Sequence, residues 1–539
     1  MNFKEIPHLS DILRNFLLFN PESPIIFNSG SFLIFFTLLL WGYSLIFNRV
    51  NARIIWLTAV SFFFYYKSSG LFVLLLFSTA LVNYYLAWIL DQIESRKTRV
   101  AFLTGSILLN LSFLLFYKYS NFLADNLNQL GMQIAERELV LPVGISFFTF
   151  QTISYLVDVY REEIKPTERL IDFCFYLSFF PQLVAGPIVR AIDFIPQIRS
   201  KLQISRDMVD EGLYMILKGF IKKAIFANYI AQYADLVYSS PGQFSGFENA
   251  IAMYAYTLQI YCDFSGYSDM AIGISLLLGF RLLENFRSPY QSISITEFWR
   301  RWHISLSFWL RDYVYIPLGG NRGAGRGTLI LTLVFMIISV WITKQIWLIF
   351  IYMAIGIFLW ARTKDKEELR LIYFTSLHLL LTMLVGGFWH GADWKFVFWG
   401  FMHGLGLMFH KWISRRMGSF LNHSIFNPLY WLLSFHFVAF LWIFFRAESF
   451  AMAKQSIETM FFSFDIAYAY PFYLARPTLV VLLLLGYALH FIPEDQKGAF
   501  KKSFSALPGM GKLIIYLICI QISLQLVESA VQPFIYFQF

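Results

Sequence analysis

The feature that most constrains this chain is a series of continuous apolar runs, each close to the length that a helix needs to cross a bilayer. The first runs occupy residues 31–47, 54–66, 71–90 and 100–117, and short loops separate them. A spanning helix needs about 20 apolar residues, whereas a transmembrane β-barrel is built from short segments of alternating polarity. The sequence therefore predicts an all-α, polytopic integral membrane protein.

Composition and charge support a chain whose surface faces lipid. Only 14% of the 539 residues are charged and 58% are hydrophobic, whereas a soluble domain carries about 25% charged residues. The net charge of +9 comes from Lys and Arg in short loops, a pattern that indicates membrane orientation and not nucleic-acid binding. Because loops 48–53 and 91–99 are basic, we predict that both are cytosolic and that the N-terminus lies outside the cytoplasm.

Other segments differ from plain spanning helices. Pro, Gly and Gln interrupt the apolar stretches 141–159 and 170–190, and lipid cannot satisfy the backbone groups that such breaks release. We therefore predict that these stretches pack inside the protein or form re-entrant elements. Residues 205–229 alternate charged and apolar side chains, which predicts an amphipathic helix at the membrane interface followed by a short span. An ordinary cytosolic helix end is the alternative.

Two carboxylates, Asp263 and Asp269, lie within the apolar sequence YCDFSGYSDMAIGISLLLGF. A carboxylate at membrane depth is a functional candidate. Ser265 and Gly266 follow Asp263 closely, however, and this spacing also suits the cap of a broken helix. We favour a structural role for both carboxylates and keep Asp269 as a candidate substrate-binding residue.

Residues 296–320, TEFWRRWHISLSFWLRDYVYIPLGG, combine aromatic side chains with arginines and a histidine. Thr296 is a candidate N-cap. On a single helix, Trp299 and His303 would be one turn apart and share a face. The pattern predicts a helix at the cytosolic interface, with aromatic side chains at headgroup depth and arginines able to meet phosphates.

The stretch 386–403, GGFWHGADWKFVFWGFMH, holds the strongest candidate for a reaction centre, His390. Gly391 follows it with a bare backbone that a substrate could approach closely. A histidine satisfied by a neighbouring helix is the alternative. His390 and His403 are too far apart to bind a metal from one helical turn, so a metal site is disfavoured.

The motif content leaves two classes of function. The sequence has no P-loop, no GxSxG element and no dinucleotide fingerprint, so phosphoryl transfer and serine hydrolysis lack support. A transferase that uses a histidine as base within the membrane remains, as does a transporter or channel with a histidine relay. A transporter usually shows repeat symmetry between its halves, and we find none here, which favours the transferase only slightly.

Five motifs occur in order along the chain: LPVGISFFTFQTISYLVDVYR, FYLSFFPQLVAGPIVR, YCDFSGYSDMAIGISLLLGF, ITEFWRRWHISLSFWLRDYVYIPLGGNRG and GGFWHGADWKFVFWGFMHG. In these motifs the chain resembles the membrane-bound O-acyltransferase family, within it the bacterial branch of alginate O-acetyltransferase and teichoic-acid D-alanyl transfer proteins. The resemblance covers about residues 31–445. It implies a single membrane domain over 1–539, a ring of tilted helices with re-entrant segments around a central tunnel.

The resemblance also implies roles for residues. His390 matches the family's general base, which takes a proton from the acceptor hydroxyl so that its oxygen can attack an acyl thioester. His303 matches the second histidine of the family. With Trp302 and Arg301 it would orient the acyl carrier or stabilise the developing oxyanion.

Trp389 and Phe388 would, by the same resemblance, wall a dry pocket and slow hydrolysis of the thioester. The chain departs from the family in one place, since the two histidines are unusually far apart in sequence. The surplus resembles an inserted apolar hairpin at about 343–370, which we expect at the periphery. Further transmembrane helices are expected over 477–527.

The function implied is the transfer of an acetyl group from a cytosolic thioester, acetyl-CoA or another acyl donor, toward hydroxyls of an extracytoplasmic polysaccharide. No tightly bound cofactor is expected. The expected partner is a protein of the SGNH-hydrolase-like type, and the expected location is the bacterial inner membrane. Transfer of D-alanine or another acyl group from an acyl carrier protein is an alternative, and so is a non-enzymatic module that translocates an acyl group or polymer.

Overall fold

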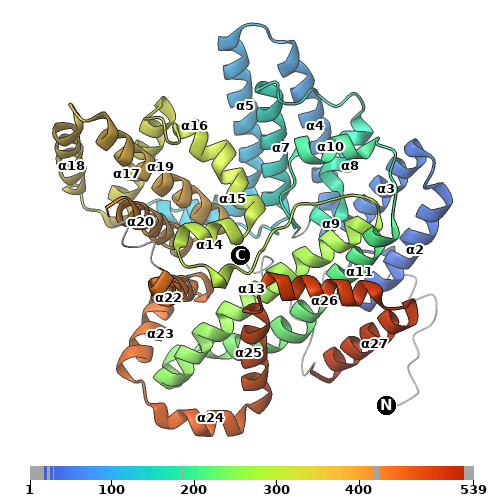
Figure 1. Ribbon diagram of the computed structural model, residues 1–539. Helices are drawn as coiled ribbons and strands as arrows, with labels where there is room; N and C mark the ends of the chain where they lie inside the picture. The colour runs from blue at the N-terminus through green and yellow to red at the C-terminus, as the bar shows by residue number, and fades with distance from the viewer. Residues whose placement is uncertain (1–16, 21–24, 28, 184–185, 417–423, 527–539) are drawn as a thin grey trace. The chain divides into compact units, whose positions relative to one another are not determined.

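The protein is helical throughout the part that the structure describes. This computed structural model describes residues 17–20, 25–27, 29–183, 186–416 and 424–526, and these residues form helices and connecting turns without a β-strand (Figure 1). The all-α prediction is confirmed. The chain divides into two compact units, and α12 (Asn228–Ser239) and α13 (Gly246–Leu277) pass from one unit into the other.

The first unit comprises Met1–Tyr233, Leu258–Asn285 and Thr478–Phe539. Its other helices are α2 (Gly30–Ile46), α3 (Val50–Ser69), α4 (Val73–Gln92), α5 (Arg96–Leu114), α6 (Ser120–Asn128), α7 (Ile145–Tyr160), α8 (Leu170–Ser178), α9 (Phe180–Leu183), α10 (Ala191–Ile198), α11 (Arg206–Phe220), α25 (Pro477–His490), α26 (Glu494–Ala506) and α27 (Gly509–Leu526).

The second unit comprises Ala234–Thr257 and Phe286–Pro477. Its other helices are α14 (Ile295–Arg301), α15 (Ile304–Leu310), α16 (Ile316–Leu318), α17 (Arg326–Thr343), α18 (Leu348–Thr363), α19 (Glu367–His390), α20 (Trp394–Arg416), α22 (Asn427–Arg446), α23 (Phe450–Phe462) and α24 (Ala469–Ala475).

Several helical stretches have the length and polarity of membrane spans. Within the described residues these are Val50–Gln92, Arg96–Asn128, Glu367–His390, Ser424–Arg446 and Gly509–Leu526. The apolar surface of the peripheral helix α18 is typical of lipid contact, because large side chains point outward along it: Ile349, Phe350, Met353, Ile357, Phe358 and Trp360. The chain is a multi-pass membrane protein, as its sequence predicts.

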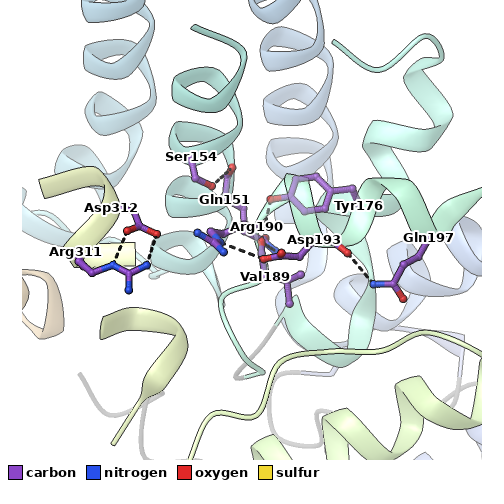
Figure 2. Close-up of polar contacts among 9 residues, drawn as sticks. All are labelled: Gln151, Ser154, Tyr176, Val189, Arg190, Asp193, Gln197, Arg311 and Asp312. Carbon is purple, nitrogen blue, oxygen red and sulfur yellow. Dashed lines mark hydrogen bonds and ion pairs between the residues drawn. The ribbon is translucent and has the colours of Figure 1, made fainter. Parts of the chain in front are cut away.

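The interrupted stretches behave differently from one another. Residues 170–190 are broken, because α8 ends at Ser178 and the short α9 follows, whereas α7 is an unbroken and largely buried helix. The extended backbone before α10 is fixed by hydrogen bonds: Tyr176 Oη and Gln151 Nε2 donate to the Val189 carbonyl at 3.0 and 3.5 Å, and Arg190 pairs with Asp193 at 3.1 Å (Figure 2).

In the first unit, α11 and α13 meet through small residues. A Cβ on Gly219 would lie 2.4 Å from the carbonyl oxygen of Gly266, and one on Gly212 would lie 2.9 Å from that of Gly273. Close approach of this kind needs glycine at both crossing points. The predicted helix at 205–229 begins as α11, and its C-terminal half is packed inside the protein, while its position at the membrane interface stays a prediction.

A close crossing also joins α19 and α20 in the second unit. A Cβ on Gly387 would lie 3.0 Å from Gly400 Cα, and a Cβ on Gly404 would lie 3.0 Å from Leu380 Cα. Gly400 and Gly404 form a G-x-x-x-G pair, which lets two helix backbones pack without intervening side chains. This crossing sets the C-terminal end of α19 against the first turns of α20.

Candidate active site

His390 is the last residue of α19 and is 4% exposed. Three aromatic rings surround its imidazole, those of Trp389, Trp399 and Phe445, with ring centroids 5.0, 5.1 and 5.2 Å away. These rings come from α19, α20 and α22, so the histidine is held where three helices meet. Its surroundings are thus largely aromatic and buried.

The backbone of Gly391 is covered by an aromatic side chain. A Cβ at Gly391 would lie 2.1 Å from the ring of Phe396, which packs directly against that backbone. Glycine is needed here because the first turn of α20 folds back onto the end of α19. The approach of a substrate to His390 over Gly391 stays a prediction, and it would require the Phe396 ring to move.

His303 lies at a break between two short helices. α14 ends at Arg301, and His303 is the N-cap of α15 with φ 44° and ψ 55°, a left-handed conformation that is uncommon for a residue with a side chain. Its imidazole is fully buried, stacks on Phe286 at 6.2 Å and meets the edge of Trp389 at 6.2 Å. The prediction of a single helix with Trp299 and His303 on one face is wrong, because the turn redirects His303.

The start of α14 also differs from its prediction. Ser294, and not Thr296, caps this helix: its hydroxyl accepts a hydrogen bond from the Glu297 amide at 3.1 Å, and Glu297 in turn accepts one from the Ile293 amide. Two backbone N–H groups at the start of α14 are thereby satisfied by side chains. Thr296 instead contacts His410 Nδ1 at 2.9 Å.

The aromatic side chains of α14 are internal. Trp299 on α14 and Trp302, its C-cap, are 8% and 2% exposed and pack inside the protein, while the position of this helix at the cytosolic interface stays a prediction. Trp302 stacks on Phe298 at 5.6 Å and meets the edge of Phe286 at 5.0 Å. Since Phe286 also stacks on His303, Trp302 supports that histidine through one intervening ring.

Arg301, Phe388 and Trp389 complete the predicted set in this unit. The Arg301 guanidinium pairs with Glu297 at 2.6 Å, and both side chains are half-buried. Phe388 is half-buried on α19. Trp389 is 4% exposed and contacts both His303 and His390, so one indole joins the two histidines that are 87 positions apart in sequence.

Asp269 belongs to the other unit and has a structural environment. Its carboxylate pairs with Lys218 at 3.0 Å and with Lys222 at 2.8 Å. Nearly two turns earlier on α13, Asp263 pairs with Lys223 at 2.5 Å, and both of these side chains are buried. Because α13 is unbroken there, the idea that Asp263 caps a broken helix is wrong. The two aspartates balance lysines of the adjacent helix.

His403 was missed as a site residue by sequence reasoning. It is fully buried on α20, its ring lies 4.5 Å from Trp399, and its Nδ1 accepts a hydrogen bond from Trp299 Nε1 at 3.3 Å. The available signal was the spacing of Trp399 and His403, which are one helical turn apart and therefore share a face. That face also carries the contact to His390.

Comparison with known proteins identifies the family. Residues 98–362 match the model of the membrane-bound O-acyltransferase family. The chain is 37% identical to the probable alginate O-acetylase of Pseudomonas aeruginosa, over 81% of this chain and 75% of that protein. It is 33% identical to the peptidoglycan O-acetyltransferase of Helicobacter pylori, over 83% and 81%.

A more distant similarity is to the teichoic acid D-alanyltransferase of Bacillus subtilis, with 26% identity over 58% of this chain and 70% of that protein. The relatives are all acyl-transferring enzymes by name, which disfavours a non-enzymatic module. The similarity to the alginate and peptidoglycan enzymes extends over most of both chains. The chain therefore belongs to the membrane-bound O-acyltransferase family and is a multi-pass membrane O-acyltransferase.

Proposed function

We propose that this protein transfers an acetyl group from a thioester donor on the cytosolic side of the membrane toward hydroxyls of an extracytoplasmic polysaccharide. The observation that carries the proposal is the shared contact of His303 and His390 with Trp389, inside an aromatic and buried environment. Two imidazoles in a dry setting suit acyl transfer, since water would hydrolyse the thioester. The alginate and peptidoglycan O-acetyltransferases among the relatives support acetyl as the group and a glycan as the acceptor.

His390 acts as the general base in this proposal. It accepts the proton of the acceptor hydroxyl while the oxygen attacks the thioester carbonyl, and it returns that proton to the departing thiolate. An imidazole suits both steps because its pKa is normally close to physiological pH. The position of His390 at a helix end, held by three rings, keeps its orientation fixed.

His303 positions the reacting groups. Its left-handed turn and its stacking on Phe286 fix the imidazole edge-on against the ring of Trp389. Arg301 and Trp302 lie just before that turn, and the Arg301–Glu297 pair is partly exposed. We infer that Arg301 meets an anionic part of the donor, while Trp302, Trp389 and Phe388 wall the acyl group.

The orientation of the chain follows from its basic loops. Asn51 in the first predicted cytosolic loop accepts a hydrogen bond from Arg169 at 3.4 Å, and Asp91 at the second pairs with Lys165 at 3.5 Å. Both loops are thus tied to the segment between α7 and α8 and lie at one end of the first unit. A shared cytosolic end is what the positive-inside rule requires, and it supports an extracytoplasmic N-terminus in the bacterial inner membrane.

A partner protein completes the reaction outside the cytoplasm. We propose an SGNH-hydrolase-like protein that receives the acetyl group and passes it to the polysaccharide. The donor is acetyl-CoA or another acyl thioester, used as a substrate and not as a bound cofactor. The D-alanyltransferase relative keeps a second candidate open, in which an acyl carrier protein delivers D-alanine to a cell-envelope polymer.

The test is acyl transfer in membranes that contain the protein, with radiolabelled acetyl-CoA and with or without the partner. We expect label on the partner or polymer with the wild type and a loss of about 10²- to 10⁴-fold for His390→Ala. Equal label with both proteins would remove His390 from the mechanism. Label from a D-alanyl carrier protein, and none from acetyl-CoA, would favour the second candidate.

A further inference from the structure

Three buried N–H groups next to the candidate base have no acceptor among the described residues. They are Nε1 of Trp399, Nε1 of Trp442 and Nε2 of His403, and their side chains are 1%, 1% and 0% exposed. Buried polar groups are normally hydrogen-bonded, and an exception calls for an explanation. Three such exceptions in one cluster of rings point to a ligand that brings its own acceptor.

The protonation state of His403 is fixed by its neighbour. An indole N–H can only donate, so Trp299 Nε1 donates to His403 Nδ1 at 3.3 Å, and Nδ1 must be unprotonated. A neutral imidazole then carries its proton on Nε2. His403 is therefore a neutral donor at Nε2, and it is held in that tautomer by a side chain from another helix.

The cluster is continuous with the candidate base. Trp399 lies 4.5 Å from His403, 5.6 Å from Trp442 and 5.1 Å from His390, all measured between ring centroids. Phe445 closes the group, 5.3 Å from Trp399 and 5.2 Å from His390. The same indole thus contacts both His390 and the fixed donor.

We propose that His403, assisted by the indole N–H groups of Trp399 and Trp442, binds the carbonyl oxygen of the acyl thioester. This inference rests on the proposed function. When the acceptor oxygen attacks the carbonyl carbon, the C=O electron pair moves onto that oxygen and His390 holds the acceptor's proton. The pair then returns, the C–S bond breaks, and the thiolate takes the proton from His390.

Neutral donors suit this role in a membrane. They stabilise the oxyanion when it forms, yet they place no charge in the apolar site beforehand. A charged lysine or arginine at the same point would carry a desolvation cost throughout the cycle. The fixed tautomer also means that the donor needs no reorganisation when the negative charge develops.

Kinetics of His403 variants provide the first measurement. His403→Phe keeps a ring but removes the donor, and we expect kcat to fall by about 10²- to 10³-fold, the range for loss of one oxyanion donor. His403→Gln keeps an N–H donor and an acceptor for Trp299, so it should recover part of that loss. His436→Phe is the matched control and should keep wild-type kcat, because the contacts of His436 are with Tyr254, Leu432 and Phe435, which lie outside this cluster.

Infrared spectroscopy separates this role from a structural one. In the His390→Ala background, the protein is loaded with S-[1-¹³C]acetyl-pantetheine, and the carbonyl stretch is read. In the His390→Ala protein, the parent of this series, we expect the carbonyl stretch to lie at a lower frequency than in apolar solvent. Adding His403→Phe should return the frequency toward the solvent value, while adding His403→Gln should keep part of the shift.

The outcomes are distinct from those that test the proposed function. Any of three results would overturn the inference. The carbonyl band is unshifted in the parent, the band is the same in the parent and after His403→Phe, or a folded His403→Phe protein keeps wild-type kcat. Full transfer activity in His390→Ala would overturn the assignment of His390 as the base. Even then, a carbonyl band that shifts on substitution of His403 would support the carbonyl-binding site. Size-exclusion and melting profiles of His403→Gln identify any loss that is due to misfolding.

Discussion

At the scale of residues, the candidate active site is defined by which aromatic rings touch which imidazoles. Trp389 contacts both candidate histidines, whereas Trp399 contacts His390 and His403. The reacting groups are thus held by packing between rings, with few charged neighbours. Such a site is rigid because each ring is confined by others from three helices.

A variant of Trp389 tests this packing. Trp389→Ala removes the indole between the histidines, and we expect transfer to fall at least tenfold, since a misplacement of about 1 Å can cost about 10²-fold. Release of free acetate should rise relative to transfer, because water gains access to the thioester. Trp389→Phe keeps a ring, so its ratio of transferred acetyl to free acetate should stay close to that of the wild type. The measurement is partition of labelled acetyl between product and acetate, and an unchanged ratio in Trp389→Ala would contradict the role of this wall.

At the scale of elements, helix crossings place the site. The α19–α20 crossing at Gly387 and Gly400 brings the end of α19 against α20, and thereby sets His390 beside Trp399. In the first unit, α11 and α13 use glycine in the same way and align lysines with aspartates. Both pairs depend on the absence of a side chain at the crossing.

The crossing of α19 and α20 can be tested by adding one carbon. A Cβ at Gly400 would lie 2.3 Å from the Met383 carbonyl oxygen, so Gly400→Ala should destabilise the protein by about 1–3 kcal/mol and lower activity with it. Gly356→Ala on α18 is the control, since no atom lies within 4 Å of its added Cβ. Thermal unfolding in detergent measures both, and equal melting temperatures would contradict the crossing.

The buried Lys223–Asp263 pair gives a second prediction at this scale. Lys223→Met leaves a carboxylate in an apolar interior, and we expect a loss of about 3–5 kcal/mol in stability, which Asp263→Leu in the same chain should largely reverse. Lys454→Met is the control, because its pair with Glu458 is exposed and should contribute under about 1 kcal/mol. Chemical unfolding of the single and double variants measures the effect. A double variant as unstable as Lys223→Met would show that the pair is not the cause.

At the scale of the whole molecule, the chain is a membrane protein whose basic loops predict its orientation. We expect Arg96→Cys to react with an impermeant maleimide only after the inner membrane is opened, because its basic loop is predicted to be cytosolic. Leu71→Cys, in the 3₁₀ turn just before α4 and 77% exposed, should react in cells in which only the outer membrane has been made permeable. The three native cysteines are buried and give a low background. The reverse labelling pattern would invert the proposed orientation.

The sequence by itself determined the class, the spans and the family. Apolar run length is a local property, so the predicted spans 31–47 and 71–90 coincide closely with α2 and α4. The five motifs are likewise continuous in sequence, and their resemblance to the membrane-bound O-acyltransferases is confirmed by comparison. His390 was found because a histidine stands out within an apolar stretch.

Only the tertiary structure decided how the candidate residues meet. Helical spacing placed Trp299 beside His303, but a left-handed turn at His303 separates them, and Trp299 bonds His403 instead. The spacing of charges predicts an amphipathic helix over 205–229, but it does not show that Lys223 is buried against Asp263. In each case the deciding interaction joins residues far apart in sequence, and hydrogen bonds, ion pairs and ring contacts of this kind leave no trace in local periodicity.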